Sequence, residues 1–301
     1  MLEVCIGIPV YNEAGNIYSL CVSLLNQKGD GWRIKRIIVV NDGSTDDTLN
    51  RIKYFEKGFS GTLLARKIKL EIISLEQNIG KANALNIIFE KARTSVLVLL
   101  DSDVVLCNPS TIDTLLKGFE NSSIGLVGGW STIHISSKIG FVERAMRFSV
   151  NFLEKAGYYG NNILCAWGGL MAIARDIYKR IELPTALMRI DAFLYLCTMK
   201  LGKRFRFIPS AKVVVKLAKK NPYWFIKIQR RVRRFPRAFR HCFSGILEEE
   251  YSSIPISTLV KRIISQFLES PLDGLFYITA KLMSSIINSL FNIQISHRWR
   301  S

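Results

Sequence analysis

Two carboxylates, Asp101 and Asp103, follow directly after an apolar run in the sequence. Residues 96–100 read Val-Leu-Val-Leu-Leu, which is typical of a central parallel strand covered on both faces. Ligands of open α/β sheets gather at the carboxyl ends of such strands. Because positions i and i+2 of an extended segment point the same way, the two carboxylates could together hold a hard divalent cation and the phosphate it carries. Alternatively, one Asp caps the next helix and the other is solvated.

A third carboxylate, Asp42, is expected at the same edge of the sheet. It follows an apolar strand predicted at residues 34–40 and lies in the sequence Asn-Asp-Gly-Ser-Thr-Asp-Asp at positions 41–47. Gly43 permits a tight turn, and the residues after it supply a helix N-cap and an acidic first turn. Asp42 has no role in that turn or helix start, so its carboxylate is a candidate ligand-binding group at the carboxyl edge of the sheet.

These side chains must be positioned by an alternation of strands and helices. Strands are predicted at residues 4–9, 34–40, 69–74 and 95–100, with helices at residues 16–26, after residue 47 and up to about residue 92. Successive strand-to-helix units imply a parallel sheet with right-handed crossovers, which is a nucleotide-binding architecture in outline. No GxGxxG follows the first strand and no GxxxxGK[ST] occurs, which argues against the dinucleotide-binding and P-loop types.

The composition indicates a globular, reduced protein. The chain has 301 residues, 49% of them apolar, enough for one large α/β domain with appendages or for two modest domains. Its six cysteines form no CxxC pair and its three histidines lack metal-site spacing, so neither a disulfide framework nor a zinc cluster is indicated. Reduced cysteines and an N-terminus without a leader pattern lead us to expect a cytoplasmic protein.

Positive charge is concentrated in one part of the chain. The net charge is +18, and fifteen Lys and Arg residues lie between Lys200 and Arg240. No Asp or Glu occurs from Ala192 to Leu247. Such a segment favours an anionic partner, which could be membrane headgroups, nucleic acid or a phosphorylated substrate.

Four segments carry a resemblance to a known family. They are Ile-Pro-Val-Tyr-Asn-Glu at residues 8–13, Val-Val-Asn-Asp-Gly-Ser-Thr at 39–45, Asn-Ile-Gly-Lys-Ala-Asn at 78–83 and Leu-Asp-Ser-Asp at 100–103. In this order and spacing they resemble the successive signatures of family 2 glycosyltransferases with a GT-A fold. The resemblance covers about residues 1–215 and implies a mixed, mostly parallel nucleotide-binding sheet flanked by helices.

The family's functional positions can be carried over residue by residue. The resemblance implies that Asp103 and Asp101 hold a divalent cation, Mn²⁺ or Mg²⁺, with Asp101 nearer the ribose or donor sugar. It places Lys81 close to the nucleotide. The remaining donor-binding positions implied for a UDP- or GDP-linked sugar are Pro9, Tyr11, Glu13 and Asp42.

The second half of the chain is expected to build the acceptor side. A strand is predicted at residues 127–130 and a helix crossing the sheet at 141–155. The apolar run at 165–174 contains Trp167, Gly168 and Gly169, and its place resembles the family's Gly-rich acceptor segment. The two glycines are consistent with backbone that approaches a sugar, although a bulge or turn explains them equally well.

Asp191 is the candidate catalytic base. Residues 188–194 match the family's Glu-Asp-X-X-Leu element in place and in Asp191 and Leu194, whereas Ile190 stands where the family usually has an acid. From local sequence alone, Asp191 could instead cap its helix. A strand at 203–215 closes this part, and Lys216 occupies the position where many relatives carry a metal-binding histidine.

The tail carries two amphipathic stretches. Residues 223–240 interleave aromatic and basic side chains and predict a basic helix, kinked near Pro236. Residues 275–295 are strongly apolar but repeat polar residues on one face, which predicts a helix lying on a membrane instead of crossing it. The alternative is a helix packed on the catalytic domain.

The sequence therefore predicts two regions and one leading function. Residues 1–215 form a catalytic domain, with a nucleotide-sugar half at 1–103 and an acceptor half at 104–215, and residues 216–301 form a helical, basic, membrane-proximal region. The predicted function is metal-dependent inverting transfer from a nucleotide sugar to a lipid-linked or glycan acceptor, at the inner face of the cell membrane with its anionic surface. A nucleic-acid-binding protein and a sugar nucleotidyltransferase are the alternatives. The confinement of charge to the tail speaks against nucleic acid, and the missing basic Gly-rich opening loop speaks against nucleotidyl transfer.

Overall fold

The computed structural model describes residues 1–133, 140–157, 160–185, 187, 189–216, 242–253 and 256–290. The described residues fall into two compact units. The first contains residues 1–132 and 166–216, and the second contains residues 133–165 together with the described residues after 241. The predicted basic helix at 223–240 and the last part of the predicted helix at 275–295 lie outside the described residues.

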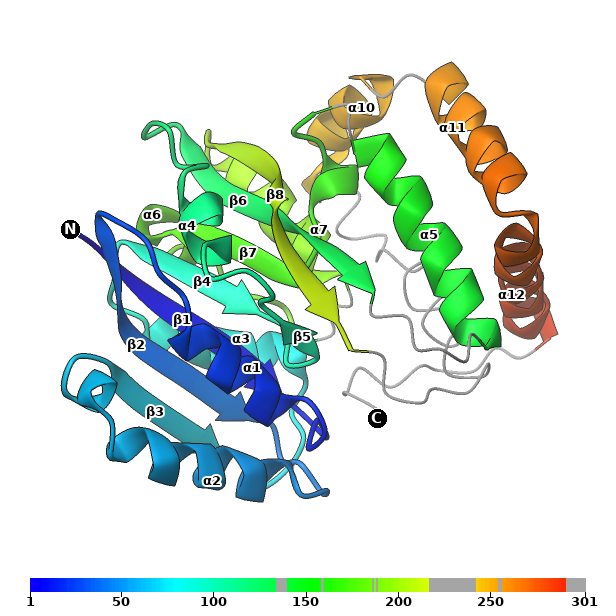
Figure 1. Cartoon of the computed structure of the whole chain (residues 1–301). Coiled ribbons are helices and arrows are strands. Elements are labelled where there is room, and N and C mark those ends of the chain that lie inside the picture. Colours follow the sequence, from blue (N-terminus) through cyan, green and yellow to red (C-terminus); the bar gives the residue numbers. More distant parts are fainter. Residues whose placement is uncertain are drawn as a thin grey trace. The chain divides into compact units, whose positions relative to one another are not determined.

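The first unit is built on one eight-stranded sheet with the order β3-β2-β1-β4-β7-β6-β8-β5 (Figure 1). The pairs β3/β2, β2/β1 and β1/β4 are parallel, as predicted, whereas β4/β7, β7/β6 and β8/β5 are antiparallel. The sheet is therefore mixed, with a parallel half that carries the nucleotide-type motifs. The strands are β1 Leu2–Val10, β2 Trp32–Asn41, β3 Lys69–Ser74, β4 Val96–Leu100, β5 Val104–Val105, β6 Ile124–Ile133, β7 Leu170–Ala174 and β8 Arg204–Val215.

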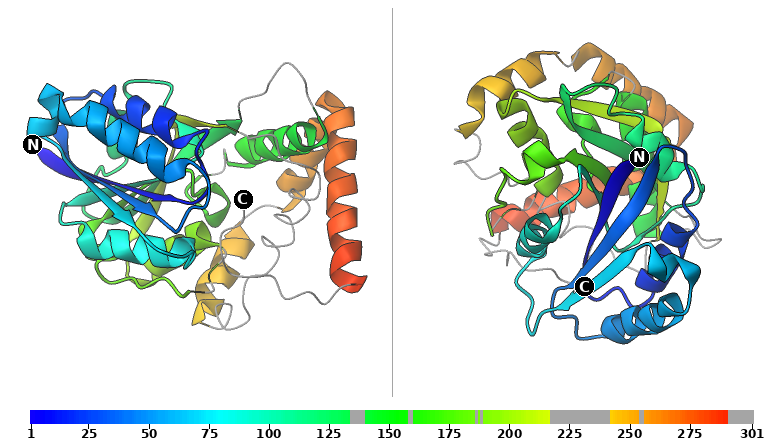
Figure 2. Two further views of the ribbon diagram at one scale, coloured as in Figure 1. Left: turned by 90° about the horizontal axis from the view of Figure 1, so that it is seen from below. Right: turned by 90° about the vertical axis from the view of Figure 1, so that its left-hand side faces the viewer.

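Helices cover both faces of this sheet, as Figure 2 (left) shows for the parallel half. One face is covered by α1 Ile17–Leu25, α2 Thr48–Ser60 and α4 Thr111–Leu116. The other is covered by α3 Lys81–Lys91, α6 Arg175–Tyr178 and α7 Ile190–Lys200. A 3₁₀ turn, η1, follows α2 at Leu63–Arg66.

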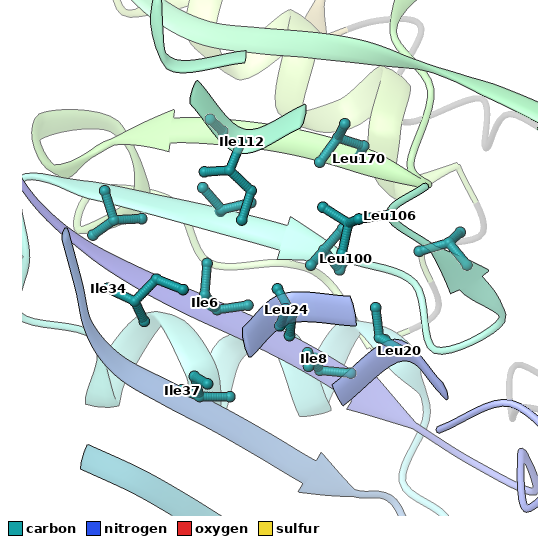
Figure 3. Packing of buried hydrophobic residues seen from close by; sticks show 14 of the residues in the cluster. Ile6, Ile8, Leu20, Leu24, Ile34, Ile37, Leu100, Leu106, Ile112 and Leu170 are labelled. Carbon is teal, nitrogen blue, oxygen red and sulfur yellow. The ribbon is translucent and has the colours of Figure 1, made fainter. Parts of the chain in front are cut away.

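The main core lies between the sheet and α1. Alternate residues of β1, including Ile6 and Ile8, point toward Leu20 and Leu24 of α1, and Leu100 of β4 joins them (Figure 3). The opposite side of β1 leaves no room for a side chain at Gly7, because a Cβ there would lie 2.5 Å from Ile88 of α3. This two-sided burial explains the continuous apolar runs of the parallel strands.

The second unit is helical. It contains α5 Phe141–Gly157, the 3₁₀ turn η2 Ile163–Cys165, α10 Ser244–Ser253, α11 Ile256–Glu269 and α12 Pro271–Leu290. The sequence predicted that the helix beginning at residue 141 crosses the sheet; the structure instead groups it with the C-terminal helices. The reason is its apolar face, on which Val142 and Ala145 pack against Ala280. In the part of the chain that the structure describes, no helix has the length and hydropathy needed to cross a membrane.

Candidate functional site

The loops after β1 and β2 are tied together at the carboxyl edge of the sheet. Asn12, with a left-handed φ of 52°, donates its backbone N–H to Oγ of Ser44 at 3.0 Å and accepts a bond from the backbone N–H of Thr45 at 2.8 Å. The backbone N–H of Glu13 donates to Oγ1 of Thr48 at 2.7 Å. These bonds fix the backbone of the segment that contains Tyr11 and Glu13, two predicted donor-binding residues.

Asp42 holds a neighbouring loop. Its two carboxylate oxygens accept hydrogen bonds from the backbone N–H groups of Ile79 at 2.7 Å and Gly80 at 2.9 Å, and its side chain is fully buried. Burial raises the pKa of Asp42 above its ordinary value, and the two hydrogen bonds partly oppose this shift. A direct contact with a nucleotide, as the family resemblance implies, therefore needs this loop to rearrange.

Four predicted site residues converge on one small volume. Lys81, the first residue of α3, forms an ion pair with Asp101 at the end of β4. A methyl group built on Gly168 would lie 3.8 Å from Oδ2 of Asp101, 3.9 Å from Cβ of Asp191 and 4.0 Å from Nζ of Lys81. Chain segments separated by more than a hundred residues thus bring a cation, two carboxylates and a side-chain-free backbone position together.

These residues line a cavity of about 180 Å³. Its polar rim contains Lys81, Asp101 and Asp191, and Pro9 at the end of β1 borders it. The remaining side chains are aliphatic and come from α3, β4, β7 and α7: Leu85, Leu99, Leu100, Met171, Ile190 and Leu194. Ile190, which replaces the family's usual acid, is therefore an apolar wall of this cavity.

Asp191 lies in the first turn of α7, where its Oδ1 accepts a hydrogen bond from the backbone N–H of Ala192 at 2.8 Å. The bond is local to this turn, and the N-cap residue of α7 is Arg189. Burial raises the pKa of Asp191, whereas the charges of Arg189 and Lys81 act to lower it. A carboxylate with a raised pKa is a stronger base than an ordinary Asp, and this one opens on the cavity.

Asp103 lies in the most acidic surroundings of the site. Burial, followed by the charges of Asp101 and Glu13, raises the pKa of Asp103 to about 7. A divalent cation would offset this repulsion, and carboxylates are the ligands that Mn²⁺ and Mg²⁺ prefer. Among the described residues, no three or more His, Cys, Asp or Glu side chains are arranged to hold a metal. The carboxylates of Asp101 and Asp103 are oxygen ligands of the kind that the predicted cation requires.

Trp167 and Gly169 are the chain neighbours of Gly168 and contact β6. Gly169 has no room for a side chain, because a Cβ there would lie 2.3 Å from Oγ of Ser131. The ring of Trp167 packs edge-on against Trp130 with centroids 5.6 Å apart. The close approach of backbone to Ser131 gives a packing reason for Gly169, while Gly168 faces the cavity.

Lys216 is tied to the acidic turn through its backbone. Its N–H donates to the carbonyl oxygen of Asp103 at 2.8 Å, at the point where β8 runs beside β5. The backbone of Lys216 therefore lies next to Asp103, the predicted metal ligand. A lysine ammonium cannot coordinate a metal, so any contribution from this side chain would be its positive charge.

Comparison with known sequences decides the family. The profile described as "Glycosyl transferase family 2" matches residues 5–182, more than half of the chain. The chain belongs to glycosyl transferase family 2. The matched region contains every predicted donor-side residue and ends before Asp191.

Curated relatives agree with this membership. The poly-beta-1,6-N-acetyl-D-glucosamine synthase of Staphylococcus epidermidis is 30% identical over 132 residues, which is 44% of this chain and 29% of that protein. The dodecaprenyl-phosphate galacturonate synthase of Rhizobium johnstonii is 28% identical over 133 residues, which is 43% of this chain and 36% of that protein. The chain thus matches only about a third of the length of these relatives.

Solved structures show that the fold is of the GT-A type, as the sequence predicted. The mannosyltransferase PcManGT from Pyrobaculum calidifontis, in complex with GDP-Man and Mn²⁺, superposes with a TM-score of 0.67 at 18% identity, over 97% of this chain and 88% of that one. TarS 1–349 of S. aureus, in complex with UDP, gives a TM-score of 0.52 at 15% identity, over 96% and 72% of the two chains.

The sequence alone did not reveal the aliphatic lining of the cavity. Leu99 and Met171 lie in apolar strands, and Leu85 and Leu194 lie on apolar helix faces, so their pattern is that of ordinary core residues. No periodicity distinguishes a core side chain from one that borders a cavity at the end of a strand. Lys81 and Asp191, in contrast, could be found because motifs mark them.

Proposed function

We propose that this chain transfers a sugar from a UDP- or GDP-linked donor to an acceptor, with inversion at the anomeric carbon. The observation that carries this proposal is the convergence of Lys81, Asp101, Asp191 and Gly168 on one cavity beside the acidic turn at Asp103. Support comes from the family membership and from similar structures solved in complex with GDP-Man and Mn²⁺ and with UDP.

The donor side is formed by the loops of the parallel half. Tyr11 and Glu13 lie on the fixed loop after β1, Pro9 borders the cavity, and Asp42 holds the loop at 79–80 that precedes Lys81. Asp101 and Asp103 would hold Mn²⁺ or Mg²⁺, which when bound neutralises negative charge on the donor diphosphate. Lys81 adds a fixed positive charge next to Asp101.

The acceptor side is where proton transfer occurs. Asp191 takes the proton from the acceptor hydroxyl as its oxygen attacks the anomeric carbon from the face opposite the leaving diphosphate. A single displacement of this kind needs one base and no enzymic nucleophile. Gly168 leaves space beside Asp191 for the reacting sugar, and Trp167 lies next to it in the chain.

A nucleotide-sugar screen tests this function. The chain is incubated with UDP- and GDP-sugars plus Mn²⁺ or Mg²⁺, and release of nucleoside diphosphate and the shift in melting temperature are measured. We expect stabilisation and slow hydrolysis with one donor, both lost in EDTA, and unchanged behaviour in a matched control, Asp176→Asn, outside the cavity. Release of pyrophosphate from a nucleoside triphosphate would indicate the nucleotidyltransferase alternative instead, and tight RNA or DNA binding without any donor effect would indicate the nucleic-acid alternative.

The acceptor is proposed to be lipid-linked, with the enzyme attached peripherally to the cytoplasmic face of a membrane. The basic residues at 223–240 would supply attraction to anionic lipid of about 1 kcal/mol per Lys or Arg near the surface. Vesicle co-sedimentation tests this point. Binding should be stronger on anionic than on neutral vesicles. This difference should weaken with salt and fall when Arg230, Arg231, Arg233 and Arg234 become Gln, but not when Lys53, Lys57, Arg66 and Lys67 do. Binding of the wild type to neutral vesicles that is as strong as its binding to anionic vesicles would eliminate the electrostatic contribution.

A further inference from the structure

The outer sides of α11 and α12 carry large aliphatic side chains that remain exposed in the described structure. These side chains are between 48% and 76% exposed. They recur at four-residue steps on α11 and at three- and seven-residue steps on α12, so those of each helix share one face. We call them the aliphatic stripe; its members are Val260, Ile264, Leu268, Leu272, Leu275 and Leu282. Scattered exposed Leu or Ile residues are normal on a protein surface, but a continuous row over two successive helices is not.

The opposite sides of these helices pack on α5, and they hold polar groups. Asp273 is 1% exposed and forms ion pairs with Arg144, at 3.1 Å, and with Arg147. Gln266 and Ser284 are also buried, and among the described residues Oε1 of Gln266 and Oγ of Ser284 have no hydrogen-bond partner. Figure 1 shows α11 and α12 following one another along α5.

The inner side of these helices combines polar groups with apolar contacts, whereas large aliphatic side chains lie on the outer side. Some apolar packing does occur inside, where Phe148 of α5 contacts Phe267 and Tyr277. However, the six large aliphatic side chains of the stripe face outward while a carboxylate, an amide and a hydroxyl are inside. The polar residue Ser284, which the sequence placed on the water-facing side of the predicted helix, is fully buried. A contiguous exposed apolar surface of this kind marks a contact with a membrane or with another protein.

We propose that the aliphatic stripe inserts into the interface of a lipid bilayer, with α11 and α12 lying parallel to its plane. Large aliphatic side chains along one side of a helix suit insertion into the interface of a bilayer, with the helix axis in its plane. This assigns a lipid-contacting role to α11 and to the first turn of α12, neither of which the sequence pattern singled out, and makes attachment partly independent of lipid charge.

Charge favours a membrane over a second copy of the chain. Each copy carries a net charge of +18, so that two copies meeting at this face would repel one another. An anionic bilayer would attract the same charge. The side chains of the stripe are aliphatic, whereas the centres of protein interfaces are enriched in Trp, Tyr and Arg.

The inference deepens the membrane attachment proposed above and does not depend on sugar transfer. Its test uses no substrate, so its failure would leave the catalytic proposal untouched, and failure of the donor screen would leave this one untouched. It also differs from the electrostatic contribution of residues 223–240, because it predicts binding that persists on neutral lipid and in high salt.

A site-specific fluorophore tests the insertion directly. In the 301-residue chain with exposed Cys107 and Cys242 changed to Ser, an environment-sensitive NBD label is placed at Leu268→Cys or, as a matched control, at Leu63→Cys. Leu268 and Leu63 are both 76% exposed, but Leu63 lies in η1 of the first unit. With neutral phosphatidylcholine vesicles we expect a blue shift at position 268 that brominated acyl chains quench, and neither effect at position 63.

Other occupants of the stripe give different results. A blue-shifted label at position 268 before any vesicle is added, with no further change on addition, would mean that protein covers the stripe and would overturn the proposal. A dimer that increases with protein concentration and dissociates when the stripe is changed, without vesicle binding by wild type, would also overturn it in favour of self-association. Quenching at positions 63 and 268 alike would show that insertion is not specific to this face.

A second variant measures the strength of the contact. Ile264→Asp, Leu268→Asp, Leu272→Asp and Leu275→Asp together should reduce partitioning into neutral vesicles by about 100-fold or more, given the free energy of burying single aliphatic side chains. Changing Tyr54 and Leu63 to Asp should leave partitioning unchanged. Unchanged partitioning of the fourfold variant would overturn the proposal, and if that variant fails to fold, the fluorophore measurement decides.

Discussion

Lys81, the first residue of α3, forms an ion pair with Asp101, the residue that follows β4. The pair joins two loops at the carboxyl edge of the sheet. In it, the single positive charge of Lys81 is used to neutralise the carboxylate of Asp101. Asp103 keeps a raised pKa despite this cation, because burial and the charges of Asp101 and Glu13 outweigh it. The charge of Lys81 therefore does not neutralise the acidic turn completely. This remaining negative charge is the physical basis for expecting a divalent cation there.

Asp103→Asn should abolish metal-dependent donor hydrolysis and transfer. The amide keeps the size of the side chain but removes the negative charge that the cation needs. Donor turnover is measured across a Mn²⁺ titration, with circular dichroism to confirm the fold and Asp176→Asn as control. Near-wild-type activity of Asp103→Asn in EDTA would show that the metal proposal is wrong.

The same substitution should stabilise the metal-free protein at neutral pH. Because the pKa of Asp103 is raised from 3.8 to about 7, the folded state binds more protons than the unfolded state between these values. The free energy of unfolding of wild type therefore falls as pH rises through this window. In chelator, Asp103→Asn should melt at a higher temperature than wild type at pH 7, and the difference should shrink toward pH 4. A difference that grows toward pH 4 would contradict the direction of this shift.

Asp191→Asn should lower turnover by about 10²- to 10⁴-fold, the usual contribution of a general base. Donor affinity should change little, because the base acts on the acceptor. Since burial raises the pKa of Asp191, the acidic limb of the wild-type rate profile should lie above the ordinary range for an Asp. Isothermal titration with the donor and a pH–rate profile separate these effects. An equal loss of donor binding would move Asp191 to the donor side.

Asp42→Ala should destabilise the first unit and weaken donor binding together. It removes the acceptors for the backbone N–H groups of Ile79 and Gly80, and an unsatisfied buried donor costs about 1–3 kcal/mol. Asp42→Asn keeps one carbonyl acceptor and should lose less of the free energy of unfolding. Chemical denaturation and donor titration measure both effects; a variant with unchanged stability but no donor binding would instead support direct contact with the nucleotide.

The sequence predicted the parallel half of the fold because local patterns determine it. The apolar runs of β1, β2 and β4 and the turn residues after each strand give both the elements and their carboxyl edge. Lys81 and Asp191 were found through family motifs, and their convergence follows from the strand order. The burial of Asp42 was not predicted, because the loop that covers it comes from 37 residues farther along the chain.

The second unit was predicted less well because an amphipathic pattern does not show what the apolar side of a helix packs against. The helix at α5 has a pattern that suits packing on a sheet or on other helices, and sequence does not choose between these. Polar residues such as Ser284 normally indicate the side facing water, yet here the side chain is inside. A polar residue indicates the exposed side of a helix only when the apolar side of that helix packs against protein.

Asp273→Asn should destabilise the second unit strongly. The buried carboxylate lies between Arg144 and Arg147, so the substitution leaves two guanidinium groups without their shared partner, a change that costs about 3–5 kcal/mol at buried ion pairs. The first unit has its own core, and its donor-induced melting shift should remain. Hydrogen exchange resolves the two parts: protection should fall in α5 and α12 but not in β1 or β4.

Asp176→Asn, at an exposed pair with Lys203, is the matched control and should change the free energy of unfolding by less than about 1 kcal/mol. If Asp273→Asn leaves protection in α5 and α12 intact, the buried ion pairs do not hold these helices together, and the apolar contacts around Phe148 must do so alone.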